Sequence, residues 1–495
     1  MSIRYKAFLG IIVIFGVGLR LWNAYDDPTL WLDEVFSAKM AEMPVKDLLL
    51  AVPRFDTHPP LYYLQLHFWA LIGHTDSWLI LNSVFLDILA MLSLCYATIR
   101  VYNRDTGFWA AAVYAVLPLN IFFASNVRMY AMFFLLIIWL WYFLELRVRS
   151  GHANLGRRLG AMLLGLAATL THGLGFFVVF FIYLQSIVRT NALYRDAQGR
   201  RAARLIGLDY IPVALAAGYS LAIGVFRQTE GVTTLDFNEL GIHLTIALLG
   251  MEFPASVYAG YIAFVLILLP PMFYRQTRAS LMWLVLLPLS ILLLISLMQK
   301  SIFMYRTVGL FWPFLALSLG VLYQSLWHDK VRRASVFPLF VLTLFSLASL
   351  NTSVAFRKAG FEGIAATWDA QAGSEAILFV PGNTQLWGTA RYLDESPAFS
   401  ALEIQPPVRD GLLRLKKKLN GSYFDRAGFF GKEDHLVVGK REIWPYPNPE
   451  RLQMLTSYWT LNPQDGKCLR EGDHVVGAYA TIGHVLIECQ SPQGS

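Results

Sequence analysis

Charged residues are scarce in this chain. Aspartate, glutamate, lysine and arginine make up 15% of its 495 residues, whereas hydrophobic residues make up 56%. Soluble globular domains carry about 25% charged residues, and the mean hydropathy here is +0.47. The shortage of charge therefore excludes the soluble globular classes and predicts a polytopic α-helical membrane protein. The sequence also shows no internal repeat and no low-complexity tract.

Cysteine is scarcer still, with three residues in the whole chain. Three cysteines are too few for the disulfide framework that holds small secreted scaffolds together. Cys95 lies in an apolar run, whereas Cys468 and Cys489 lie near the C-terminus. The last two can form a disulfide if that region is exported, and two unpaired thiols are the alternative.

Apolar runs of spanning length recur along the first 351 residues. No small-residue cleavage site ends the first run, so we expect an uncleaved helix there. The run at 159–188 is too long for one helix and is broken at "THGLG", which predicts a hairpin of two spans. The run at 241–273 is interrupted at "MEFPAS" and is interpreted as an interfacial piece followed by one span. The sequence thus predicts about eleven transmembrane helices, in runs near residues 7–25, 77–99, 107–124, 129–146, 159–188, 207–226, 241–273, 280–298, 308–326 and 334–351.

The net charge of +7 is explained by membrane topology, without a nucleic-acid partner. If the N-terminus is cytoplasmic, the cytoplasmic segments hold 18 lysines and arginines, and the opposite segments before residue 352 hold seven. Cytoplasmic loops of membrane proteins are enriched in these residues in the same way. An odd number of spans then places residues 352–495 at the periplasmic or external face of the plasma (inner) membrane.

The C-terminal residues 352–495 differ in character from the rest of the chain. They contain short β-branched runs bounded by turns, such as "EAILFVPG", "HLVVG" and "VVGAYATIGHVLIEC". The stretches "TARYLDE" and "RDGLLRLKKKL" suggest helices. We therefore predict a transmembrane domain over residues 1–351 and a small soluble α/β domain over residues 352–495.

The first outer segment, residues 26–76, is unusually acidic, with eight aspartates and glutamates. Two stretches in it, "WLDEVFSAKMAEM" and "FDTHPPLYYLQLHFWALIG", predict two juxtamembrane helices. The apolar part of the second stretch has about 14 residues, fewer than the roughly 20 that cross a bilayer. We expect both helices to lie on the membrane surface, with their ionisable residues facing an aqueous cavity.

Later outer turns supply mainly cationic groups. A carboxylate beside cations suits one task, which is to deprotonate a hydroxyl while an anionic phosphate leaving group is bound. Each group also has a simpler role: acids stabilise helix starts, and arginines at a membrane edge extend to lipid headgroups. The polar groups of these later turns are Arg128, Tyr130, His172, Arg227, Glu230, Lys300, Tyr305 and Arg306.

The acidic loop and the first cationic turns resemble the bacterial family-39-like glycosyltransferases, which have the polytopic fold called GT-C. Relatives of that family include protein O-mannosyltransferases and lipid A aminoarabinose transferases. The resemblance covers roughly residues 10–190, and the remaining spans match by pattern only. No segment resembles the β-trefoil insert of eukaryotic protein mannosyltransferases. The matching stretches are "WLDEVFSAKMA", "FDTHPPLYYLQLHFWALIG", "LPLNIFFASNVRMYAMFFLL" and "ATLTHGLGFFVVF".

The resemblance implies an inverting transfer of sugar from a polyprenyl-phosphate donor to a hydroxyl of a glycan, lipid or protein. It implies that Asp33 is the general base, that Glu34 supports it, and that Arg128 binds the lipid phosphate. Asp56 matches a second acidic position that helps hold the acceptor or a divalent metal; no cofactor is required, and no metal ligands are assigned. The other expected donor-phosphate residues are Tyr130, Lys300 and Arg306, and the expected substrate-binding residues are His58, Tyr62, His172 and Glu230.

Three other interpretations remain open. A lipid or glycan transporter usually carries ionisable residues in mid-membrane, and here only Arg20 and Asp87 look embedded. An O-antigen ligase-like protein usually has a large late outer loop instead of an acidic first one. A structural or sensor protein would use its exported C-terminal region to bind a partner.

Overall fold

The computed structural model describes residues 3–26, 28–151, 154–222, 235–250, 256–273, 280–298, 302–327, 341, 343, 361–371, 376–380, 388–389, 391–392, 436–438, 441–444, 455, 457–461, 467–470, 473–481 and 484–491. The chain divides into two compact units, which are described separately. Unit 1 comprises Met1–Asp26, Asp56–Trp69 and Trp78–Phe356, and unit 2 comprises Asp27–Phe55, Ala70–Ser77 and Arg357–Ser495.

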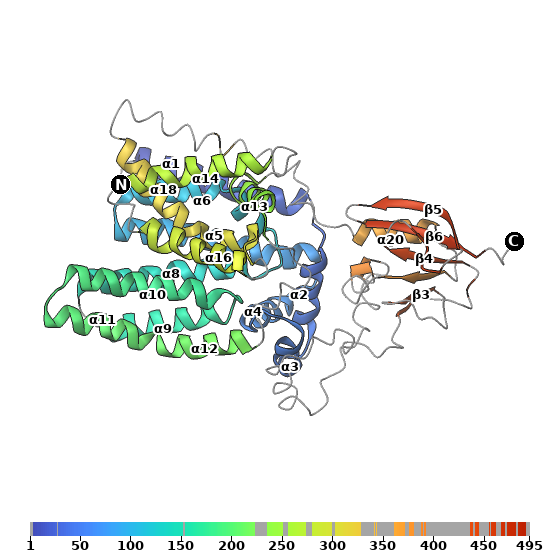
Figure 1. Cartoon of the computed structure of the whole chain (residues 1–495), viewed down its shortest axis with the longest axis horizontal. Coiled ribbons are helices and arrows are strands. Elements are labelled where there is room, and N and C mark those ends of the chain that lie inside the picture. The colour runs from blue at the N-terminus through green and yellow to red at the C-terminus, as the bar shows by residue number, and fades with distance from the viewer. Residues whose placement is uncertain are drawn as a thin grey trace. The chain divides into compact units, whose positions relative to one another are not determined.

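Unit 1 is built of helices (Figure 1). Among the described residues, six helical segments are long and apolar enough to cross a membrane by length and composition, or seven if the bent pair α6 and α7 is one span. The chain is therefore a membrane protein. Its helices are α1 (Ile3–Asp26), α4 (Leu61–Ala70), α5 (Asp76–Val101), α6 (Arg104–Val116), α7 (Pro118–Ala124), α8 (Tyr130–Ser150), α9 (Leu155–Thr169), α10 (Gly175–Leu193), α11 (Ala197–Asp209), α12 (Ile211–Ala222), α13 (Phe237–Leu249), α14 (Ser256–Phe273), η2 (Met282–Leu286), α16 (Leu287–Met298), α17 (Tyr305–Val308), η3 (Gly309–Phe311) and α18 (Trp312–Trp327).

The predicted runs agree with the structure in part. The break at "THGLG" separates α9 from α10, as the sequence predicts. The run at 107–124 is bent by 69° between α6 and α7 and is not one straight helix. Proline disfavours helical geometry in the residue before it, and Leu117, which precedes Pro118, has extended backbone angles. The count of eleven spans stays a prediction, because all of the run at 334–351 except residues 341 and 343 falls outside the described residues.

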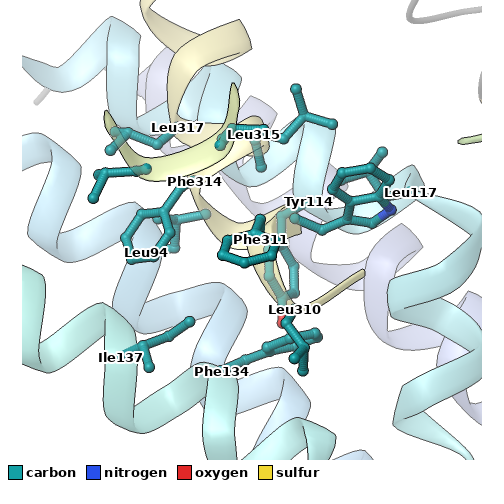
Figure 2. Packing of buried hydrophobic residues seen from close by; sticks show 14 of the residues in the cluster. Leu94, Tyr114, Leu117, Phe134, Ile137, Leu310, Phe311, Phe314, Leu315 and Leu317 are labelled. Carbon is teal, nitrogen blue, oxygen red and sulfur yellow. The ribbon is translucent and has the colours of Figure 1, made fainter. Parts of the chain in front are cut away.

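The core of unit 1 forms where α18 packs against α6 (Figure 2). Phe311 and Phe314 lie fully buried among side chains of α5, α6 and α8. Gly320 allows the close approach of the two helices, since a Cβ there would lie 2.6 Å from the backbone nitrogen of Ala110. This tight packing holds the helix ends that carry the polar groups described below.

Unit 2 begins with two short helices, α2 (Leu32–Glu42) and α3 (Val45–Phe55). With α4 they make three helices between α1 and α5, so the prediction of two was wrong. The missed helix is α3, whose residues Leu48, Ala51 and Val52 are fully buried. These positions follow the helical spacing of three and four residues, but the run is short and contains Pro53.

The rest of unit 2 contains a six-stranded mixed sheet of order β2-β3-β1-β4-β6-β5, with α20 (Phe361–Gln371) packed against β5 and β6 (Figure 1). β1 pairs in parallel with β3 and β4, and the other pairs are antiparallel.

Cys468 and Cys489 form a disulfide, one of the two alternatives left open by the sequence. The domain boundary at residue 351 stays a prediction. The strands are β1 (Ile377–Phe379), β2 (Leu436–Val438), β3 (Arg441–Trp444), β4 (Ser457–Leu461), β5 (His474–Thr481) and β6 (His484–Gln490).

Candidate active site

A buried carboxylate organises the turn that precedes α4. The Oδ1 atom of Asp56 accepts hydrogen bonds from the backbone N–H groups of Thr57 at 2.6 Å and His58 at 3.2 Å. Its Oδ2 atom accepts a hydrogen bond from the hydroxyl of Tyr63, in the first turn of α4. Aspartate commonly bonds the backbone just after it in this way. The sequence "DTHPPLYY" thus builds a fixed turn around its own acid.

Arg128 reaches the same group from a different part of the chain. It lies between α7 and α8 in a tight turn, where its backbone N–H bonds the carbonyl of Asn126 at 2.7 Å. Its guanidinium donates to the hydroxyl of Tyr63 at 3.3 Å. Tyr63 therefore links the cation to Asp56, although 65 sequence positions separate Tyr63 from Arg128. Asp56 and Arg128 are both buried, with 8% and 7% exposure.

Two histidines complete this cluster. The Nδ1 atom of His58 accepts the backbone N–H of Gly173, and the Nδ1 atom of His172 accepts that of Leu174, both at 3.1 Å. The two rings meet edge to face at 4.8 Å. A neutral imidazole that accepts at Nδ1 carries its proton on Nε2. The turn between α9 and α10 therefore holds both histidines as Nε2–H donors.

Burial shifts the pKa values of Asp56 and His172. It raises the pKa of Asp56, and the nearby charge of Arg128 and the hydrogen bonds to the carboxyl oppose that shift. Burial lowers the pKa of His172 well below its usual value, and His58 and Arg128 lower it further. The cluster thus combines a permanent cation with a neutral histidine at neutral pH. Such a set of donors suits an anion.

The depressed pKa of His172 predicts a loss of stability in mild acid. The unfolded chain takes up a proton below pH 6.5 and the folded chain does not, so the free energy of unfolding falls as pH falls through that range. We expect His172→Gln, whose amide oxygen can accept the Leu174 N–H, to shrink the difference in thermal midpoint between pH 7.5 and 5.5. An unchanged difference would contradict the assignment.

The other predicted site residues of unit 1 lie at several different places in the structure. Tyr130 follows Arg128 at the start of α8, stacks on Phe123 at 4.0 Å and lies 5.6 Å from the ring of His172. Tyr62 is fully buried beside Tyr63. Arg306 lies on α17 and donates to the hydroxyl of Tyr305 at 3.0 Å. Lys300 and Glu230 fall outside the described residues.

Asp33 and Glu34 belong to unit 2, in the first turn of α2. The side chain of Asp33 is half-buried. Glu34 is fully buried, and its carboxylate accepts the backbone N–H of Trp31 at 3.1 Å, as glutamate does in the third position of a capped helix. Glu34 thus has a structural task at the start of α2. That Asp33 and Arg128 serve one reaction stays a prediction.

Sequence reasoning missed several groups in the cluster. Tyr63 was assigned to the membrane interface and given no role in the site, although it lies seven residues after Asp56, in the first turn of the helix that follows. Thr57 and Asn126 were also missed. Their Oγ1 and Oδ1 atoms are buried and have no hydrogen-bond partner in the part of the chain that the structure describes. Buried polar atoms of this kind bind water or a ligand.

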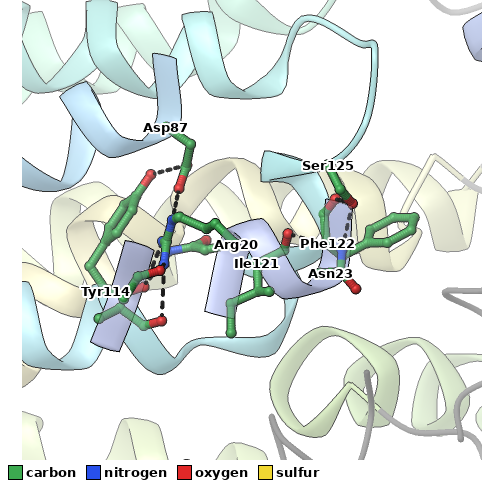
Figure 3. A network of polar contacts seen from close by, with 10 residues as sticks. Arg20, Asn23, Asp87, Tyr114, Ile121, Phe122 and Ser125 are labelled. Carbon is green, nitrogen blue, oxygen red and sulfur yellow. Dashed lines mark hydrogen bonds and ion pairs between the residues drawn. The ribbon is translucent and has the colours of Figure 1, made fainter. Parts of the chain in front are cut away.

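The embedded pair Arg20 and Asp87 has a structural explanation (Figure 3). Both side chains are fully buried, and the guanidinium bonds the carboxylate at 2.5 Å. The carboxylate also accepts from the hydroxyl of Tyr114 at 2.6 Å, and Arg20 donates to the carbonyls of Gly16 and Ala115 at 2.9 and 3.2 Å. The pair thus joins α1, α5 and α6 and gives no support to a transport path.

Among the described residues, no group of three or more histidines, cysteines, aspartates and glutamates could hold a metal ion. Asp56 and His58 are the nearest approach to a ligand pair in the cluster. The Asp56 oxygens and the His58 Nδ1 atom already bond backbone and phenol donors.

Solved structures share the fold of the chain. ArnT from Cupriavidus metallidurans in the apo state is 14% identical and matches with a TM-score of 0.54, over 97% of this chain and 98% of that chain. The same protein bound to undecaprenyl phosphate is 12% identical and also gives 0.54, over 98% and 97%. No family model and no curated protein matches the sequence.

More distant matches are larger proteins. The oligosaccharyltransferase AglB from Archaeoglobus fulgidus, in complex with an inhibitory peptide and a dolichol-phosphate, is 13% identical, with a TM-score of 0.46 over 79% of this chain and 63% of that chain. The chain spans 61% of the AglB structure in complex with Zn and sulfate. The neighbours are GT-C glycosyltransferases, so the predicted resemblance is confirmed for the fold. A shared fold at this identity does not by itself establish the reaction.

Proposed function

We propose that this protein is an inverting glycosyltransferase that moves a sugar from a polyprenyl-phosphate donor to an acceptor hydroxyl. The observation that carries the proposal is the buried cluster of Arg128, Tyr63, Asp56, His58 and His172 between apolar helices. A lipid phosphate has its charge at the membrane surface and its chain in the bilayer. A cation and neutral N–H donors fixed at helix ends fit that charge.

The proposed reaction is a single displacement. The acceptor oxygen forms a bond to the anomeric carbon while the bond from that carbon to the phosphate oxygen breaks. Asp33 takes the proton of the acceptor hydroxyl, and Arg128 stabilises the charge that develops on the leaving phosphate. Asp56 supports Arg128 through Tyr63. The buried oxygens of Thr57 and Asn126 are suited to hydroxyl groups of the sugar.

The proposal includes a location for the protein. The N-terminus lies in the cytoplasm of a cell with an inner or plasma membrane, and the residues after 352 lie outside. The disulfide between Cys468 and Cys489 supports this orientation, because disulfides persist in oxidising compartments. The acceptor is a glycan, lipid or protein that reaches the outer face.

A panel of donors tests the reaction. Purified protein is incubated with polyprenyl-phosphate sugars and, separately, with diphosphate-linked glycans. Release of the free polyprenyl phosphate and a mass shift of the acceptor identify donor and acceptor, and a chelator tests whether a divalent metal is needed. Turnover of the diphosphate-linked donors alone would favour a ligase instead.

Replacing Arg128 tests the binding of the donor phosphate. Arg128→Ala removes a charged hydrogen-bond donor, which is worth about 1.5–3 kcal/mol, so we expect kcat/KM for the donor to fall roughly 10- to 100-fold. Arg128→Lys keeps the charge and should lose less. Arg200→Ala removes an exposed arginine from α11 and serves as the control. Equal activity of Arg128→Ala and Arg200→Ala would reject the assignment.

A further inference from the structure

A two-residue segment of the C-terminal region contacts the first outer loop within unit 2. The hydroxyl of Tyr392 accepts the backbone N–H of Leu30 at 2.8 Å and donates to Oδ2 of Asp76. Leu30 is fully buried and lies two residues before the start of α2. Tyr392 therefore fixes the chain at the point where it enters that helix.

The neighbouring Arg391 contacts the other end of the same helix. Its guanidinium bonds Oδ1 of Asp76 through Nε at 2.7 Å and Nη2 at 2.6 Å, and it donates to the carbonyl of His74 at 3.1 Å. It also lies 3.8 Å from the carboxylate of Glu42, the last residue of α2. Glu42 in turn lies 3.7 Å from Lys39.

These contacts are sheltered from solvent and are therefore less screened than surface ion pairs. The side chain of Arg391 is 11% exposed, and that of Asp76 is 16% exposed. Burial raises the pKa of Glu42, and the charges of Lys39 and Arg391 oppose that shift. Because the carboxylates are partly desolvated, each of them depends on its cationic partner.

Helix α2 depends on such contacts because it is short. It has 11 residues, and isolated helices shorter than about 12–15 residues are marginal in water. Consecutive residues of the C-terminal region contact Leu30, two residues before α2, and Glu42, its last residue, across more than 300 sequence positions. A helix that is fixed at both ends holds the side chains of its first turn in one orientation. Asp33 is one of those side chains.

We propose that Arg391 and Tyr392 are positioning residues that hold α2, and with it Asp33, in the orientation that the transfer reaction needs. This assignment gives the C-terminal region a role in catalysis without contact to substrate, and it rests on the function proposed above. The chemical basis is the hydrogen bond from Leu30 to Tyr392, the hydrogen bond from Tyr392 to Asp76, and the ionic contacts of Arg391 with Asp76 and Glu42.

Hydrogen exchange and kinetics together test the proposal on the full-length protein. Arg391→Gln and Tyr392→Phe each keep most of the side-chain volume and remove the polar contacts. We expect faster amide exchange in residues 32–42 and a kcat lower by roughly 10- to 100-fold, with the KM for the donor unchanged. Arg391→Lys should restore part of kcat, since it keeps the charge.

The control is Arg470→Gln. Arg470 is another arginine of the C-terminal region, and it pairs with Asp473 at 2.9 Å and donates to the carbonyl of Leu455. It should leave both exchange in residues 32–42 and kcat unchanged. Unchanged exchange in Arg391→Gln and Tyr392→Phe, or faster exchange with normal kcat, overturns the positioning role. An unaltered protein that transfers no sugar from any donor would instead refute the proposed function, and exchange would still decide whether α2 is held.

Discussion

Asp33→Asn is expected to lower the rate of sugar transfer by roughly 10²- to 10⁴-fold, the range that a positioned general base contributes. Asparagine has nearly the same size as aspartate but cannot take the proton of the acceptor hydroxyl. Asp33 is half-buried in the first turn of α2, so the helix should persist. The lost interaction with the helix dipole costs about 0.3–1 kcal/mol. Release of polyprenyl phosphate at saturating donor measures the effect.

The chain offers a matched control for this change. Asp47 occupies the first turn of α3, the next helix of the same loop, and is also half-buried. Asp47→Asn therefore makes the same chemical change at an equivalent helix position, and we expect normal transfer. Asp33→Glu keeps a carboxylate and should retain part of the activity. Transfer by Asp33→Asn within a few-fold of the Asp47→Asn rate would refute Asp33 as the base.

Hydrophobic and charge patterns predict the broad fold, because helices that cross a bilayer must be long, apolar and nearly free of charge. Apolar runs correctly indicate a helical membrane protein, and the polar break at "THGLG" correctly separates α9 from α10. Local features that interrupt an apolar run are harder to predict from the sequence. Pro118 bends the run at 107–124, and α3 is too short and too mixed in composition to stand out.

The candidate site is predictable only in part, for a physical reason. Residue type and spacing identify Asp56, His58, Arg128 and His172, and the structure brings these four into one cluster. Sequence does not show that Tyr63 links Asp56 to Arg128, because its contact with Arg128 spans 65 positions. Long-range contacts are set by packing and not by local pattern.

The contacts of the C-terminal region also cannot be predicted from the sequence. Nothing in "TARYLDE" indicates that its arginine and tyrosine bond Asp76, more than 300 positions earlier. The carboxylate of Glu34, which the resemblance predicts to support the base, bonds the backbone at the start of α2, and its role in catalysis stays a prediction.

Asp87→Ala is expected to destabilise the protein by about 3–5 kcal/mol, since it leaves the charge of Arg20 buried without its carboxylate. Both side chains are fully buried, and the pair joins α1 to α5 (Figure 3). Arg149→Ala is the control, because it breaks an ion pair with Glu145 in which the arginine is 46% exposed. Pairs of that kind contribute about 1 kcal/mol or less. Thermal unfolding in detergent compares the two variants.

The double variant Arg20→Met/Asp87→Leu separates a structural role from a role in transport. Removing both charges together removes the desolvation cost of each, so we expect most of the lost stability to return. Sugar transfer should then be near normal, because neither residue contacts the described cluster around Arg128. A double variant that is as stable as the unaltered protein but inactive would instead place the pair on a substrate path. Stability that stays low would mean that the hydrogen bonds to Tyr114, Gly16 and Ala115 hold these helices together.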